Sequence, residues 1–320
     1  MPRVFVTRRL PDGGLDPLVA AGVELVTNDA DEPRSKAELC AAAADADALV
    51  CVLSDRIDAD VLAAGAGRLR VVATVAVGYD NIDLAAAAVH DIAVCNTPGV
   101  LDDTTADLTF LLILAASRLA GDAERDLRSG RWAGWGITQY LGQDVHGATL
   151  GLVGYGRIAQ AVARRASGFG MQVHHHTRAD TGAPGYVADL DQLLAESDIV
   201  SLHVPLTNDT RHLLDARRLE LLKPTAVLVN TARGPIVDEE ALAVALESGS
   251  LFAAGLDVYE REPAVHPRLL AAPRTVLLPH VGSASHATRT EMAHLAGEGV
   301  LAVLAGRRPT NLVATTPGGN

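Results

Sequence analysis

The chain has 320 residues, 48% of them hydrophobic and 21% charged, and carries a formal net charge of −12. This length and composition predict two globular domains and exclude a disordered or collagen-like protein. The acidic surface argues against nucleic acid or a membrane as a partner, because it repels phosphate backbones and anionic lipids. Three cysteines without a CxxC pair argue against a disulfide scaffold and predict a cytoplasmic protein. No apolar run reaches the ~20 residues of a membrane span, and no signal peptide is evident.

Strand-like and helix-like patterns alternate along the first hundred residues. Valine-rich runs predict strands at 4–7, 48–53, 71–77 and 92–96. Alanine-rich stretches predict helices between them, at 36–46 and 84–90. Continuous apolar strands separated by helices are typical of a parallel sheet that is covered on both faces. The pattern therefore predicts a doubly wound α/β domain.

A long helix is predicted next, from 104 to 130, with Asp102 or Asp103 as its N-cap. A second α/β series follows, with a helix at 158–168 after its first strand and a last helix at 287–304. Its strands are predicted at 149–153, 172–176, 199–203, 226–230, 253–258 and 276–278. Two such halves predict a ligand cleft between them.

A glycine-rich loop joins the first strand and helix of the second series. Gly154, Gly156 and Ala159 have the G-x-G-x-x-G/A spacing of a dinucleotide fingerprint, in the strand–loop–helix–strand context that it requires. Gly154 permits a tight turn, and Gly156 lets the backbone approach a pyrophosphate. The helix that begins at Arg157 and Ile158 directs its free N–H groups at the phosphates. The alternative is a set of small residues in an ordinary turn.

The next strand ends at Thr177 and Arg178, where an NAD-binding domain usually carries Asp or Glu for the ribose 2′-hydroxyl. Threonine and arginine favour a 2′-phosphate instead, so NADP is the predicted cofactor, with NAD as the alternative. Arg178 could also simply point to water. The preceding tract His174–His176 resembles a metal site, but adjacent strand residues point to opposite faces, and no metal is predicted.

Three later strands end close to residues that could carry out chemistry, namely Arg233, Glu262 and His280. Ligands of open parallel sheets bind beyond the carboxyl ends of the strands. Histidine can protonate a carbonyl oxygen near neutral pH, and a carboxylate beside it favours its charged form. Arginine can bind a substrate carboxylate and polarise the adjacent carbonyl. Together they predict hydride transfer to a carbonyl, although each alone could be a surface or turn residue.

These motifs together resemble the D-2-hydroxyacid dehydrogenase family over nearly the whole chain. The motifs are Val77–Asp83, Gly154–Ala159, His203–Thr207, Val229–Gly234, Gly255–Val258, Glu262–Pro263 and Pro279–Ser283. The resemblance implies two doubly wound parallel-sheet α/β domains, with a Rossmann cofactor domain inserted into a flavodoxin-like substrate domain. It places the substrate domain at 1–98 plus 287–320 and the dinucleotide-binding domain at 99–286.

The resemblance also implies a role for each site residue. Arg233 binds the substrate, and Glu262 pairs with His280, the general acid/base. Backbone amides of Val77 and Gly78 bind the substrate carboxylate. Asp257 is expected to hold the nicotinamide carboxamide. Further cofactor contacts are implied for Thr105, His203, Pro205, Thr207, Thr231, Ala232, His280 and Gly282.

Within the family the chain looks most like glyoxylate/hydroxypyruvate reductases, which make a D-2-hydroxy acid from a small 2-oxo acid. It departs from the usual pattern at Ala159 and in lacking an acid near Thr177. 2-Ketogluconate, or another 2-oxo acid, stays open as the substrate, because the loops that set the pocket size cannot be read from sequence. The non-enzymatic alternative is a dinucleotide-sensing corepressor, and the few residues beyond the last helix favour catalysis.

The family's usual assembly is a homodimer formed through the cofactor domains. Trp132 and Trp135 lie in a segment that, in this subgroup, can reach the partner's active site. The alternative for both tryptophans is packing in the core or at an interface.

Overall fold

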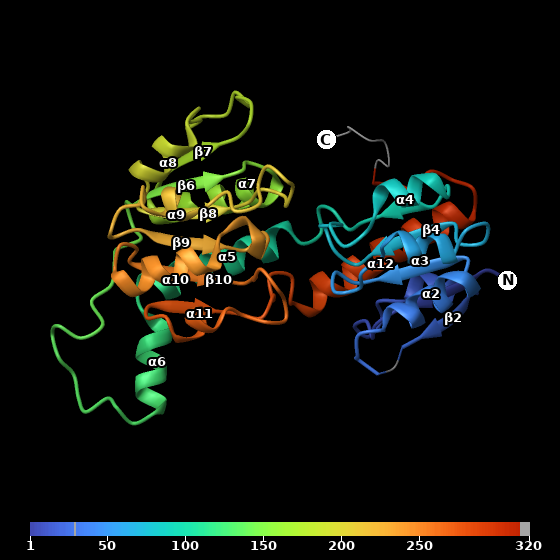
Figure 1. Cartoon of the computed structure of the whole chain (residues 1–320), viewed down its shortest axis with the longest axis horizontal. Coiled ribbons are helices and arrows are strands. Elements are labelled where there is room, and N and C mark those ends of the chain that lie inside the picture. The colour runs from blue at the N-terminus through green and yellow to red at the C-terminus, as the bar shows by residue number, and fades with distance from the viewer. Residues whose placement is uncertain (29, 314–320) are drawn as a thin grey trace. The chain divides into compact units, whose positions relative to one another are not determined.

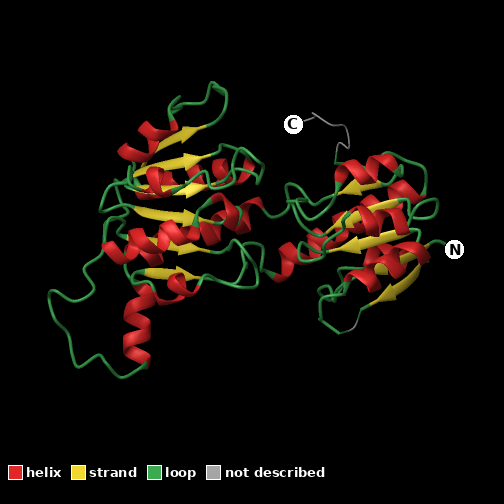
Figure 2. Ribbon diagram, viewed as in Figure 1, coloured by secondary structure: helices red, strands yellow, loops and turns green. Residues whose placement is uncertain are grey.

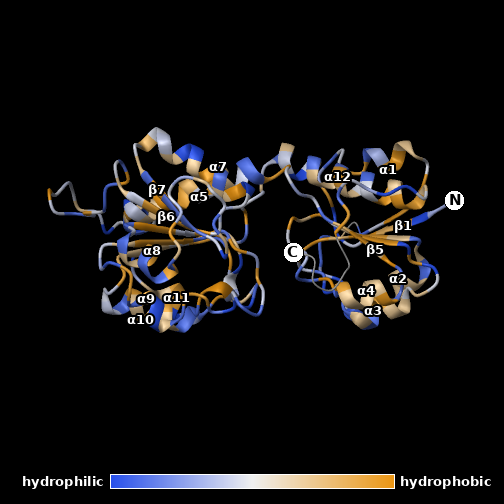
Figure 3. Ribbon diagram, turned by 90° about the horizontal axis from the view of Figure 1, so that it is seen from above, coloured by the Kyte–Doolittle hydropathy of each residue, from blue (hydrophilic) through white to orange (hydrophobic). Residues whose placement is uncertain are grey.

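The computed structural model describes residues 1–28 and 30–313. The chain divides into two compact units: unit 1 is Met1–Leu101 with Ser283–Asn320, and unit 2 is Asp102–Gly282. Each unit contains one sheet, and every strand pairing is parallel (Figure 2). Helices cover both faces of each sheet (Figure 3). The predicted fold class, with two doubly wound parallel sheets, is confirmed.

Unit 1 has a five-stranded sheet in the order β2-β1-β3-β4-β5, which is the flavodoxin-like order. Its strands are β1 (Arg3–Val6), β2 (Glu24–Thr27), β3 (Ala48–Cys51), β4 (Val71–Thr74) and β5 (Ala93–Cys95). One face carries α1 (Asp16–Ala20) and α12 (His286–Leu304) (Figure 3). The other carries α2 (Lys36–Asp45), α3 (Ala59–Ala64) and α4 (Leu84–Val89).

The strands of unit 1 differ in how strongly the sequence marks them. β3 and β4 are buried along their whole length, which is why both appear as unbroken apolar runs. β2 lies at the sheet edge and has no buried residue, so it carries no apolar run and is absent from the predicted elements. Helix starts are marked more clearly, because Ser35, Asp58 and Asp83 each accept backbone N–H groups as N-caps.

Unit 2 has a six-stranded sheet in the order β11-β10-β9-β8-β6-β7. Its strands are β6 (Thr149–Val153), β7 (Gln172–His176), β8 (Ile199–Leu202), β9 (Val227–Asn230), β10 (Ala253–Leu256) and β11 (Thr275–Leu277). One face carries α5 (Asp102–Ser117) and α7 (Arg157–Ala166). The other carries α8 (Leu190–Glu196), α9 (Ala216–Leu219), α10 (Glu239–Ser248) and α11 (Pro267–Ala271). The strand order reverses beside β6, and ligands of such sheets bind at this switch point.

The prediction of one helix from 104 to 130 is wrong. The chain forms α5 and a separate α6 (Ala120–Arg128), and the two are bent by 69°. Leu119, at the break, is left-handed with φ of 53°. Ser117, the last residue of α5, accepts the N–H of Gln143 at 2.8 Å. Its carbonyl is thus bonded to the chain that returns after α6. No single helix of the described chain is long and apolar enough to cross a membrane; only the bent pair passes, by length and composition.

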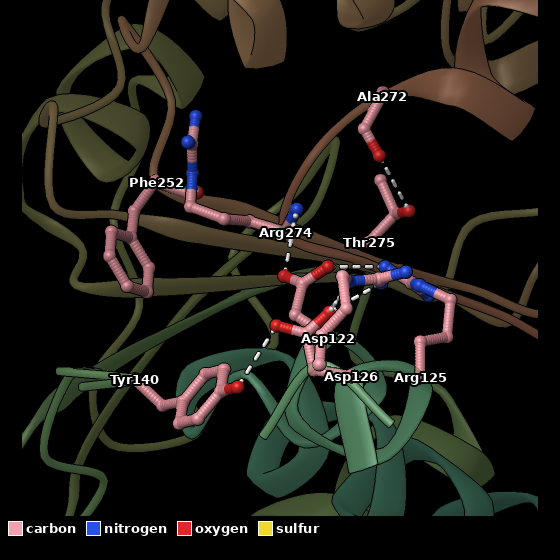
Figure 4. Close-up of polar contacts among 9 residues, drawn as sticks. Asp122, Arg125, Asp126, Tyr140, Phe252, Ala272, Arg274 and Thr275 are labelled. Carbon is pink, nitrogen blue, oxygen red and sulfur yellow. Dashed lines mark hydrogen bonds and ion pairs between the residues drawn. The ribbon is translucent and has the colours of Figure 1, made fainter. Parts of the chain in front are cut away.

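Residues 120–143, here called the arm, comprise α6 and the long loop that follows it (Figure 1). Two aspartates of α6 hold the arm (Figure 4). Asp122 accepts the backbone N–H of Arg274, beside β11, at 3.1 Å. Asp126 accepts the hydroxyl of Tyr140 at 2.9 Å and Nε of Arg131 at 2.8 Å. The first contact fixes α6 to the sheet, and the second pair fixes the loop to α6.

Candidate active site

The glycine-rich loop between β6 and α7 has the geometry of a phosphate site. Gly154 has a φ of 94°, and a Cβ there would lie 2.7 Å from the carbonyl oxygen of His203, so only glycine fits. Gly156 is the N-cap of α7, and an added Cβ would meet nothing within 4 Å. No side chain hydrogen-bonds as the cap of α7. The first N–H groups of this helix are therefore available to a pyrophosphate, and the residues present fit a dinucleotide.

Arg157, the first residue of α7, has an ion-pair partner that the sequence reasoning missed. Its Nε lies 3.3 Å from Oδ2 of Asp102, the first residue of α5. The Asp102 side chain is 15% exposed, and burial raises its pKa against the opposing charge of Arg157. Ile158, next along the helix, is half-buried. The only sequence signal for this pair was the acid at the helix start, which suggested a cap.

The loop after β7 carries the residues expected to select the cofactor. The hydroxyl of Thr177 donates to the carbonyl of Ala179 at 2.6 Å, and Arg178 is exposed. Asp180, an acid in the same loop, accepts the backbone N–H of Gly182 at 2.8 Å. The loop therefore presents a cation, Arg178, immediately after the strand end.

The histidine tract lies within β7 itself. His175 is buried, and its ring stacks on that of Tyr155 in the glycine-rich loop, with 3.8 Å between ring centroids. Burial lowers the pKa of His175, so the ring is neutral near pH 7. His174 and His176 are half-buried. Among the described residues, no three His, Cys, Asp or Glu side chains are grouped to hold a metal ion.

His203 follows β8 and faces the first glycine of the loop through its backbone. Its N–H donates to the carbonyl of Val153 at 2.7 Å, and its Nε2 lies 2.9 Å from Oγ of Ser201. Burial lowers the pKa of His203 to about 4, so this ring is also neutral near pH 7. Pro205 and Thr207 follow on an exposed turn.

Arg233 is placed by a buried asparagine at the end of β9. The side chain of Asn230 accepts the N–H of Ala232 at 3.0 Å and donates to the carbonyl of Arg233 at 2.9 Å. A Cβ on Gly234 would lie 1.8 Å from the carbonyl carbon of Tyr259. The arginine loop thus packs backbone to backbone against the loop that carries Glu262. A buried polar residue at a strand end was the available signal for Asn230, which the sequence reasoning left without a role.

Glu262 and His280 form the pair that the sequence predicts. His280 Nδ1 lies 2.8 Å from Glu262 Oε2, and the two side chains are 25% and 30% exposed. The other carboxylate oxygen accepts the N–H of Tyr259 at 3.0 Å. Burial alone would raise the pKa of Glu262, but the hydrogen bond and charge of His280, the Tyr259 N–H and the charge of Arg233 hold it below its usual value. Glu262 is therefore ionised at neutral pH, and Nε2 of His280 is the nitrogen left for proton exchange.

The loop that carries His280, here called the histidine loop, is held in an uncommon conformation. His280 is left-handed with φ of 56°, and its N–H donates to the carbonyl of Asp257 at 2.8 Å. The buried Asp257 carboxylate accepts the N–H groups of Val281 at 2.7 Å and Gly282 at 2.8 Å, and burial raises its pKa. Strained backbone of this kind persists where neighbouring contacts determine it, commonly at functional sites. The structure thus gives Asp257 a contact with the histidine loop, while its contact with the carboxamide stays a prediction.

Several expected cofactor residues gather around this loop. A Cβ on Gly282 would lie 3.6 Å from Cγ2 of Thr105, which is buried on α5. Thr231 lies on the same side of the sheet, with its hydroxyl 3.0 Å from that of Thr109 on α5. Val77 and Gly78 belong to unit 1, where they follow β4 and are half-buried. Their role toward the substrate stays a prediction.

The chain is similar to known proteins over almost its whole length. Residues 110–282 match the family described as D-isomer specific 2-hydroxyacid dehydrogenase, NAD binding domain. A glyoxylate reductase of Korarchaeum cryptofilum is 48% identical over 98% of this chain and 96% of its own length. A protein of solved structure from Thermus thermophilus is 46% identical, with a TM-score of 0.91 over 98% of this chain and 100% of that one. An NADPH-dependent glyoxylate/hydroxypyruvate reductase of Sinorhizobium meliloti, solved with NADP and malonate, is 35% identical, with a TM-score of 0.87 over 99% and 98% of the chains.

Proposed function

Because the chain belongs to the D-isomer-specific 2-hydroxyacid dehydrogenase family, we propose that it reduces glyoxylate or hydroxypyruvate to the 2-hydroxy acid with NADPH. The predicted family, and the predicted use of a nicotinamide dinucleotide, are confirmed. The observation that carries the proposed chemistry is the 2.8 Å contact between His280 and Glu262. This pair lies on the same sheet as the glycine-rich loop and Arg233.

The side chains divide the chemistry between them. When bound, the reduced nicotinamide supplies a hydride to the carbonyl carbon of the 2-oxo acid. His280 begins as an imidazolium and donates the Nε2 proton to the carbonyl oxygen as that oxygen gains negative charge. Glu262 accepts the Nδ1–H, which fixes the ring and stabilises its charged form before transfer. Arg233 binds the carboxylate of the substrate and polarises the neighbouring carbonyl.

The choice of NADPH over NADH is supported by the charge of the loop after β7. Arg178 is exposed directly after the strand end, and Thr177 precedes it. The nearest acid of the loop, Asp180, is hydrogen-bonded to the backbone of Gly182. A 2′-phosphate therefore meets a cation where an NAD-specific domain carries an acid.

The proposal is tested by measuring NADPH oxidation with purified protein and a panel of 2-oxo acids. Glyoxylate and hydroxypyruvate are expected to be reduced fastest, with pyruvate and 2-ketogluconate as comparisons. His280→Ala should remove turnover and leave the Kd of NADPH, measured by fluorescence, nearly unchanged. A chain that binds NADPH but reduces no member of the panel would instead be a dinucleotide-binding module.

A homodimer is a second part of the proposal. The outer face of α5 exposes Leu111 and Leu114 beside a pocket of about 760 Å³, which Phe110 and Phe169 also line. The arm exposes a larger set of apolar side chains: Leu127 (59%), Trp132 (49%), Trp135 (80%), Ile137 (75%) and Leu141 (64%). Apolar surface of this extent is typical of an interface, and a second copy of the chain is the expected occupant.

The two tryptophans are exposed, so packing in the core is wrong, while packing at an interface stays a prediction. Their insertion into a partner's active site stays a prediction. Sedimentation of the wild type should give twice the monomer mass, and Trp135→Ser with Ile137→Ser should shift the equilibrium toward monomer. A monomeric wild type at micromolar concentration would refute the dimer. A cytoplasmic location also stays a prediction, supported by three cysteines that are all free.

A further inference from the structure

Tyr259 contacts Glu262 and the end of the strand that leads to His280. Its backbone N–H donates to Glu262 Oε1 at 3.0 Å. Its hydroxyl donates to the carbonyl oxygen of Leu278 at 2.9 Å, and Leu278 directly follows β11, two residues before His280. One residue therefore connects the loop that carries the carboxylate to the strand end that carries the imidazole.

We propose that Tyr259 is a positioning residue of the reaction, whose hydroxyl holds the end of β11 so that His280 Nδ1 stays on Glu262. The inference rests on the proposed function for its effect on rate, but the contacts it invokes lie entirely within unit 2. Hydride transfer needs the proton donor at a fixed place, and small displacements of a catalytic group lower the rate steeply. A residue that sets this place contributes to turnover without touching the substrate.

The position of Tyr259 is itself fixed by contacts from its neighbours. Gly234 packs against its carbonyl group with no room for a Cβ. The next residue, Glu260, exchanges two hydrogen bonds with Glu239: its N–H donates to Glu239 Oε1 at 2.7 Å, and the Glu239 N–H donates to Glu260 Oε1 at 3.0 Å. The backbone at Tyr259 is therefore held on two sides. A ring anchored in this way transmits its position to Leu278.

The hydroxyl, rather than the ring, is the part that this role requires. Tyr259 is 6% exposed and belongs to the apolar core on one face of the sheet, where a phenylalanine ring would pack equally well. Burial raises the pKa of Tyr259, so its hydroxyl remains protonated and donates throughout the neutral range. A buried hydroxyl is costly without a partner, and here the main partner is the carbonyl beside the catalytic histidine.

The chain offers a matched control in β11, the strand whose end Tyr259 contacts. Thr275, at the other end of β11, is 3% exposed, and its hydroxyl donates to the carbonyl of Ala272 at 3.2 Å (Figure 4). Tyr259→Phe and Thr275→Val each remove one buried hydroxyl with little change in shape. Both should lower the melting temperature by similar amounts. Only the first removes a contact with the loop of His280.

Steady-state kinetics with hydroxypyruvate and NADPH separate positioning from a purely structural role. Tyr259→Phe should lower kcat about three- to tenfold, because the proton donor is less well placed, and leave the KM of NADPH unchanged. Thr275→Val should keep the wild-type kcat. Wild-type kinetics in Tyr259→Phe, or equal losses in both variants, would overturn the proposal.

A measurement without substrate keeps this test independent of the proposed reaction. Nitrogen NMR of the His280 imidazole reports its hydrogen bond to Glu262 in the unliganded protein. Tyr259→Phe should weaken that signature, and Thr275→Val should leave it intact. If the wild type reduced no 2-oxo acid, the proposed function would fail while the NMR comparison still decided the positioning role. An unchanged His280 signature in Tyr259→Phe would reject it.

Discussion

Replacing Glu262 with glutamine tests how much the carboxylate contributes to proton transfer. The carboxylate accepts from His280 at 2.8 Å and from the N–H of Tyr259 at 3.0 Å. A glutamine can offer an oxygen to only one of these donors, and it carries no charge to stabilise the imidazolium. A hydrogen bond between charged groups contributes about 1.5–3 kcal/mol, and the partial exposure of this pair favours the lower end. Since ~1.4 kcal/mol is a factor of ten, kcat should fall about 10- to 100-fold at neutral pH.

The assay is kcat for hydroxypyruvate reduction between pH 5 and 9, with the Kd of NADPH measured alongside. In Glu262→Gln kcat should be lowered across this range, and NADPH binding should be unaffected. Glu260→Gln is the control from the same loop, because that carboxylate contacts His212 at 3.0 Å and the backbone of Glu239 instead of His280. The reasoning is refuted if Glu262→Gln keeps the wild-type kcat.

The contribution of Glu262 to the stability of the native state changes with pH in a defined direction. The fold holds the pKa of Glu262 below its usual value, so the carboxylate stabilises the native state at every pH above its unfolded value of about 4.3. This contribution is lost only as the pH falls below that value, through the lower pKa of the folded state. A loss of activity between pH 5 and 6 therefore has to come from another group.

Three further substitutions test separate parts of the site. Arg178→Asp should raise the KM of NADPH at least about tenfold and lower that of NADH, because a carboxylate repels the 2′-phosphate; an unchanged ratio of the two KM values would remove Arg178 from cofactor choice. Gly234→Ala should lower the unfolding free energy by about 2 kcal/mol or more and remove most of kcat, because the added Cβ would lie 1.8 Å from backbone. The control is Gly249→Ala, where the added Cβ meets open space but φ is 76°. It should cost only about 1 kcal/mol and keep kcat. His203 has a pKa of about 4 in the folded protein and about 6.5 in the unfolded chain, so the wild type should lose up to ~3 kcal/mol of unfolding free energy as the pH falls from 6.5 to 4. In His203→Gln the unfolding free energy, measured by urea titration, should fall less over this range. An equal fall in both proteins would contradict the reasoning.

The sequence predicted the elements that show as buried apolar runs, and it predicted the polar residues that follow the strands. β6 and β7 begin and end at the residues predicted for them, because each is a short run that ends at a glycine or a polar residue. Arg233, Glu262 and His280 were chosen as site residues because residues that follow parallel strands meet at one edge of the sheet, and their roles stay a prediction. The structure places them there and supplies the 2.8 Å contact between the acid and the imidazole, which no spacing could give.

Apart from the exposed edge strand β2, the failures share a physical cause, since each depends on a contact between residues far apart in the sequence. The helix break near Leu119 involves the carbonyl of Ser117, which accepts an N–H from Gln143. A helical pattern across that position contains no trace of the returning chain. The ion pair of Arg157 with Asp102 was missed for the same reason, because an acid at a helix start is equally well explained as a cap.

The site also shows why the types of catalytic residue are easier to predict than their precision. An imidazole, a carboxylate and a guanidinium are required by the chemistry, so their presence at strand ends is informative. Their placement is enforced by groups whose types are unremarkable: the Asp257 carboxylate on two backbone N–H groups, and the Tyr259 hydroxyl on one carbonyl. Such contacts hold His280 in a left-handed conformation that a histidine seldom adopts. Differences in rate among chains that share Arg233, Glu262 and His280 should therefore arise in these supporting contacts, where Tyr259 and a phenylalanine differ by a single hydroxyl.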